Sequence, residues 1–142
     1  MKTSKEILSS ILKTTQMGQV GIRSVLDTSM RPGLRKALQS QLHEYDSIET
    51  EAHSIASQRG WELRELDPAV RMMSDMMVRM RLNGKNTDSK IAGMTIQGNT
   101  RGMIKSLKNI HQFDGSDSQV QILSQKLLDC EAANIRQMQT FL

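Results

Sequence analysis

Aromatic side chains are scarce in this chain, whose 142 residues include one tyrosine, one tryptophan and two phenylalanines. Leucine, isoleucine and eleven methionines must therefore supply most of the apolar core. This composition suits helices better than sheets, because strands are enriched in aromatic residues. The sequence also lacks a Cys/His finger, a helix-turn-helix spacing and aromatic residues interleaved with basic ones, so it has no motif typical of nucleic-acid-binding domains.

Cysteine and long apolar runs are scarce as well. The single cysteine, Cys130, excludes an internal disulfide and fits a reducing compartment. No run approaches the roughly 18 apolar residues of a membrane span. The segment 1–13 is amphipathic and lacks the apolar core and small-residue cleavage site of a secretory signal. We therefore expect a soluble, cytoplasmic protein.

The formal net charge of +4 raises the possibility of a nucleic-acid partner. The basic excess lies between Arg64 and Lys108, where nine lysines and arginines face four acidic residues. Spread over that length, such an excess is typical of an ordinary solvated surface. Binding to nucleic acid is therefore not expected, and a basic, DNA-associated bundle remains the second alternative function.

Helical periodicity and terminal signals predict five helices. Pro32 and Pro68 stand where a first helical turn begins, Asp67 is a suitable N-cap, and Gly60 follows the end of a helix. The other expected N-caps are Thr3 or Ser4, Thr87 or Asp88, and Asp117 or Ser118. Residues 83–86 are expected to form a turn. The predicted helices cover residues 3–28, 32–59, 68–82, 88–111 and 118–141.

Four of these helices have matched lengths, which favours a single four-helix bundle domain over residues 1–142. The short helix 68–82 can carry the chain from one end of the bundle to the other. That connection predicts an up-down-down-up order with a crossover helix between the second and third long helices. A plain five-helix array remains the alternative.

The segment 91–110 carries glycines inside a helical pattern, where each costs about 1 kcal/mol relative to alanine. We expect that Gly18, Gly98 and Gly102 are retained because another helix packs closely against them. The inward-facing stripe of this segment is predicted to consist of six residues: Ala92, Ile96, Thr100, Met103, Leu107 and Ile110.

The runs GMTIQGNTRGMI and KLLDCEAANIRQMQTFL, together with MGQVGI and HEYDSIETEA, resemble a group of small uncharacterised bacterial ferritin-like proteins. This group belongs with the spore-coat-like and domain-of-unknown-function branches of the superfamily. The resemblance covers most of the chain. It implies the up-down-down-up bundle and implies no particular activity.

The ferritin-like di-iron centre needs a glutamate from each of two helices and a Glu-x-x-His motif from each of the others. Here Ser47 and Asn134 stand at the histidine positions, and Gln19 and Gln97 replace carboxylates. Because amides are poor ligands for iron, we expect neither a di-iron centre nor another cofactor. A weak metal site, if one forms, would use Glu44, Glu51 and Glu131.

We instead expect these polar residues to hydrogen-bond one another at the middle of the bundle, where paired carboxylates and amides can be buried. The predicted buried network contains Thr15, Gln19, Glu44, Gln97, Glu131 and Asn134.

Methionines are concentrated in the short helix, in the run RMMSDMMVRM. Flexible methionine surfaces suit partner binding, so we expect a homodimer or a protein partner there, through Met72, Met73, Met76, Met77 and Met80. The function expected is that of a non-enzymatic structural or interaction protein, with no catalytic residue. The alternative is a divergent ferritin-like protein that binds iron or manganese, as an oxidoreductase or a store.

Overall fold

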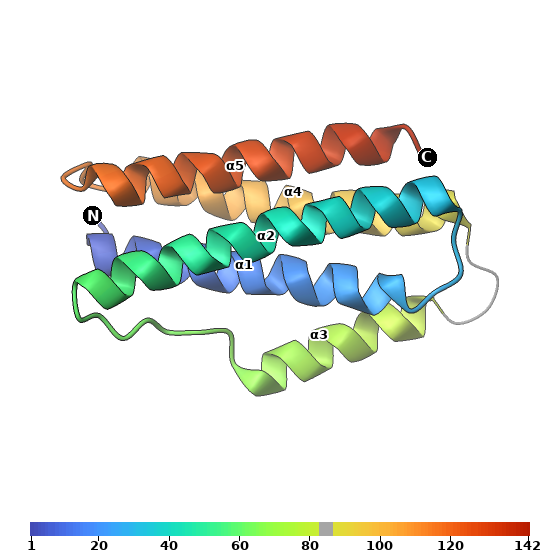
Figure 1. The fold of residues 1–142 in the computed structure, drawn as a ribbon, viewed down its shortest axis with the longest axis horizontal. Helices are drawn as coiled ribbons and strands as arrows, with labels where there is room; N and C mark the ends of the chain where they lie inside the picture. Colours follow the sequence, from blue (N-terminus) through green and yellow to red (C-terminus); the bar gives the residue numbers. More distant parts are fainter. Residues whose placement is uncertain (83–86) are drawn as a thin grey trace.

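The computed structural model describes residues 1–82 and 87–142, and the turn expected at 83–86 lies outside them. The described residues form five helices and no strand, an architecture compatible with an all-α bundle (Figure 1). The helices are α1 (Ser4–Leu26), α2 (Pro32–Gln58), α3 (Pro68–Arg81), α4 (Asp88–Gln112) and α5 (Ser118–Gln139). Their bounds lie within a few residues of those predicted.

Local signals set where the helices begin. The Thr3 hydroxyl accepts a hydrogen bond from the Glu6 amide at 3.2 Å, and Thr87 accepts one from Lys90 at 3.1 Å. Asp67 and Asp117 cap α3 and α5 in the same way. Each cap satisfies a backbone N–H group that has no partner inside its own helix.

The long helices pack around one core. Figure 1 shows that α2 and α4 begin at the same end of the molecule, whereas α1 and α5 begin at the opposite end. The closest pairs are α1 with α2 and α4 with α5, while α3 packs on α1. The largest fully buried apolar side chains are Ile7, Leu8, Ile11, Leu12, Leu34, Leu38, Ile48, Ile91, Leu123, Leu127 and Met138.

Helix α4 contributes a different face to the core from the one predicted. Thr100 and Leu107 of the predicted stripe are exposed, and Ile96, Met103 and Ile110 are only partly buried. Ala92 of the predicted stripe is buried, and the other buried residues of α4 are Ile91, Asn99, Ser106 and Asn109. The prediction was wrong because buried polar side chains on the other helices bind these small polar residues and turn α4 toward them.

The expected close packing holds for two of the three glycines. An added Cβ would lie 2.6 Å from Cζ of Tyr45 at Gly18 and 1.6 Å from the Glu131 carboxylate at Gly102. At Gly98 it would meet nothing within 4 Å, so the prediction for Gly98 was wrong. None of the described helices is both long and apolar enough to cross a membrane.

Gly18 and Gly21 lie on the same helix but differ in their surroundings, because nothing lies within 4 Å of a Cβ added at Gly21. We expect Gly18→Ala to lower the free energy of unfolding by about 1–3 kcal/mol, since the buried Tyr45 ring must move. Gly21→Ala should raise it by up to about 1 kcal/mol through helix propensity. Urea denaturation checks both values, and shifts of the same sign would contradict the close contact at Gly18.

Candidate functional site

Two features outside the regular core are candidates for function. The first is the outer surface of α3, which we call the Met face and define as Met72, Met73, Met76 and Met80. The second is a cleft of about 390 Å³ between α1, α3 and α4. The fifth methionine of the predicted interface, Met77, lies at this cleft.

The Met face is exposed because α3 contributes no buried residue to the core. Its four side chains are between 56% and 69% exposed. Val78 packs partly buried against the core. Polar contacts also attach α3 to α1: the Ser24 hydroxyl donates to Asp75, and Arg79 forms an ion pair with Asp27 at 2.6 Å. The Ser24 hydrogen bond, and then Arg79, lower the pKa of Asp75. These contacts leave the apolar side of α3 free.

The buried polar network differs from the predicted one. Glu44 and Gln97 are exposed, so their assignment to the network was wrong. Thr15 and Gln19 are buried but bind elsewhere: Thr15 donates to the Ile11 carbonyl of its own helix, and Gln19 donates to Asp46 at 2.8 Å. The other two predicted members, Glu131 and Asn134, are buried and face α4.

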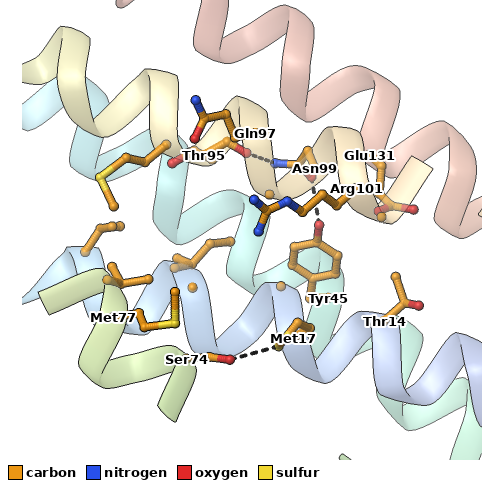
Figure 2. Close-up of a pocket in the computed structure, with 18 of the residues that line it drawn as sticks. Thr14, Met17, Tyr45, Ser74, Met77, Thr95, Gln97, Asn99, Arg101 and Glu131 are labelled. Atoms are coloured by element: carbon orange, nitrogen blue, oxygen red, sulfur yellow. Dashed lines mark hydrogen bonds between the residues drawn. The ribbon is translucent and has the colours of Figure 1, made fainter. Parts of the chain in front are cut away.

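Asn99 of α4 connects the buried polar groups of three helices. Its side-chain oxygen accepts a hydrogen bond from the Tyr45 hydroxyl at 2.8 Å (Figure 2). The same oxygen accepts a second hydrogen bond, from the Asn134 amide at 3.2 Å. The amide nitrogen of Asn99 donates to the Thr95 carbonyl at 3.0 Å. Burial raises the pKa of Tyr45 above its usual range, so the phenol stays protonated and donates.

Glu131 is the buried acid of the site, with 1% of its surface exposed. The Ser106 hydroxyl donates to its Oε1 at 2.8 Å. Burial raises the pKa of this carboxyl from its ordinary 4.5 to about 7, and the Ser106 hydrogen bond opposes the rise. Its Oε2 occupies the space that a side chain at Gly102 would need, so a Cβ there would displace the carboxyl group.

The three glutamates named for a weak metal site do not form one cluster. Glu51 is exposed and pairs with Lys126 at 2.6 Å, Glu44 is exposed, and Glu131 binds Ser106. Within residues 1–82 and 87–142, no group of three histidine, cysteine, aspartate or glutamate side chains is placed to hold a metal ion. The three glutamates therefore cannot act as one ligand set in this arrangement.

The cleft has a polar end and an apolar end along α4. The polar end is lined by Thr14, Lys105 and Glu131. Figure 2 shows the guanidinium of Arg101 turned from this end toward the middle of the cleft. The opposite end is lined by the apolar residues Ile22, Val25, Met77, Val78 and Met94, and by Arg81 at the end of α3. Tyr45 and Asn99 lie between these ends, and four glycines, Gly18, Gly21, Gly98 and Gly102, line the walls.

Sequence reasoning missed Asn99 and Ser106. The signal that could have identified them is the helical spacing of small or amide side chains at Asn99, Gly102, Ser106 and Asn109. Such a face matches the polar positions Glu131 and Asn134 of α5. No family model, curated protein or solved structure matches this chain.

The raised pKa of Glu131 predicts a specific pH dependence of stability. The folded state binds the Glu131 proton more tightly than the unfolded state, so protonation of Glu131 stabilises the fold. This contribution is complete below about pH 4.5 and is lost as the pH rises through about 7. Between pH 5 and pH 8, ionisation of Glu131 should lower the free energy of unfolding of the wild type by roughly 2–3 kcal/mol. Glu131→Gln has no carboxyl group to ionise and should not show this decrease. Urea denaturation of both proteins at the two pH values checks this.

The three histidines are exposed and are present in both proteins, so the difference between the two pH curves reports Glu131. Equal slopes for the wild type and the variant would contradict the raised pKa.

Proposed function

We propose that the protein is a non-enzymatic interaction protein with the ferritin-like up-down-down-up arrangement, and that it assembles with a second copy through the Met face. The observation that carries the proposal is the exposure of all four Met-face side chains on a helix with no buried residue. Large exposed apolar patches are uncommon on monomeric proteins and mark interaction sites.

The helix directions support the ferritin-like arrangement. In Figure 1, α2 and α4 run in the same direction, and α3 lies between them in sequence and spans part of the length of α1. A short helix between two parallel helices is what a crossover connection requires. The resemblance of the chain to small ferritin-like proteins is in keeping with this order.

The chemistry of the buried groups supports a non-enzymatic role. Burial, followed by the charges of Glu44 and Glu131, raises the pKa of Cys130 to about 11, so its thiol is protonated and a poor nucleophile near neutral pH. Tyr45 and Asn99 are committed to each other. Each of these groups has a structural partner within the bundle.

A second copy is the partner that the charges of α3 favour. The acidic residue Asp67 caps the beginning of the helix, and the basic residues Arg79 and Arg81 lie in its last turn. An antiparallel pair of α3 helices about a twofold axis places the acidic end of one copy beside the basic end of the other. Twofold dimers are the commonest assemblies, and such an interface is self-complementary.

Light scattering coupled to size exclusion tests this assembly. We expect the wild type to elute with the mass of a dimer at tens of micromolar and the double variant Met73→Glu/Met76→Glu to elute as a monomer. The variant should keep its thermal melting midpoint within a few degrees when both proteins are diluted to monomers, because both side chains are exposed in the single copy.

Ile122→Glu is the matched control, because Ile122 is 69% exposed on α5, away from the Met face. It should leave the mass of the dimer unchanged. A wild type that stays monomeric at high concentration would overturn the proposed assembly, and so would a dimer that persists in the double methionine variant.

A further inference from the structure

We propose that the cleft between α1, α3 and α4 binds a small amphiphilic carboxylate, with its charged group at the Arg101 and Lys105 end and its apolar body at the Met77 and Met94 end. This inference does not depend on the proposed assembly, because the Met-face side chains do not line the cleft.

Missing side chains create the space. Gly21 of α1 and Gly98 of α4 both line the cleft, and a Cβ added at either would meet nothing within 4 Å. Glycine in a helix is destabilising, so two helical glycines that no neighbour approaches need another explanation. An open volume between the helices explains both. Its 390 Å³ falls within the usual range for small-molecule sites, about 300–1,000 Å³.

The charges that line the cleft favour an anion. Its fully charged lining residues, Arg81, Arg101 and Lys105, are all basic. None of the three forms an ion pair in the part of the chain that the structure describes. By contrast, the nearby Arg79 is paired with two aspartates. Arg101 and Lys105, which the proposed assembly does not use, are therefore available to a ligand.

Glu131 supplies a second and independent observation. The residue is 1% exposed, yet only its Oε1 has a hydrogen-bond partner among the described residues. Oε2 lies in the gap at Gly102 and faces the polar end of the cleft. When protonated, a carboxyl in this position donates a hydrogen bond to a carboxylate bound beside Arg101.

The long dimension of the cleft suits an extended apolar chain. Lining residues on α4 run from Met94 to Lys105, which corresponds to about 17 Å along the helix axis. The apolar end includes two methionines, whose flexible side chains adapt to an aliphatic ligand. The ligand class is therefore a monocarboxylate with an unbranched apolar chain.

Isothermal titration calorimetry with decanoate tests the proposal, with decylamine and acetate as comparison ligands, all below their micellar concentrations. We expect decanoate to bind at one site per chain, at least tenfold more tightly than decylamine, which has the opposite charge, and acetate, which has no apolar body. Equal affinity for decanoate and decylamine would overturn the assignment of an anion site.

Gly98→Leu places a side chain in the cleft from a position where an added Cβ meets nothing within 4 Å. It should weaken decanoate binding at least tenfold while the fold remains intact by circular dichroism. Thr100→Leu is its control, because Thr100 is exposed on the same helix and does not line the cleft. Unchanged decanoate binding by Gly98→Leu would overturn the placement of the ligand.

The charged end is tested separately. The double variant Arg101→Gln/Lys105→Gln should weaken decanoate binding about tenfold and leave the binding of decanol, which has no charge, within twofold. Lys108→Gln removes an exposed cation of α4 outside the cleft and should have no effect on either ligand. An equal loss for decanoate and decanol would contradict the role assigned to the two cations.

Discussion

The burial of the Glu131 carboxyl against α4 is the constraint on which the interior arrangement depends. A carboxyl group can be removed from water only where a hydrogen bond offsets the loss of hydration, or where it takes up a proton. Ser106 provides the hydrogen bond, and Gly102 provides the space for the second oxygen. Both residues lie on one face of α4, so this face must turn toward α5. The rotation of α4 about its own axis follows from that requirement.

The same rotation accounts for the surface of α4 and for the cleft. With Asn99 and Ser106 directed inward, Ile104 and Leu107 are left exposed on the other side of the helix. Gly98 is brought to the edge that faces α1 and α3, where no side chain fills the space beside it. The cleft is therefore a consequence of packing a polar helix face inward, and its volume does not require any irregularity in the helices.

The sequence predicted what depends on local signals. Helix bounds and caps at Thr3, Asp67, Thr87 and Asp117 agree with the structure because capping hydrogen bonds join residues two or three positions apart. Contacts between residues on different helices were harder to predict from the sequence. Glu44 adjoins the buried Tyr45, and a difference of one residue rotates a side chain by about 100° on the helix, which is enough to expose it. The orientation of α4 was mispredicted because hydrophobic periodicity places apolar residues inside, whereas here the polar partners on α2 and α5 decide which face is buried.

Helix α3 connects the two proposals because it presents different apolar residues on different sides. Met77 and Val78 line the cleft, whereas the Met face points away from it. Polar contacts with α1 hold α3 in place, and exposed ion pairs of this kind contribute little stability. A second copy packed on the Met face and a ligand in the cleft would both favour the docked position of α3. Assembly and ligand binding would then both shift the equilibrium between docked and undocked α3. Thermodynamic linkage requires that each raise the affinity of the other by the same factor. The small core contribution of α3 is thus the property that would couple assembly to ligand binding.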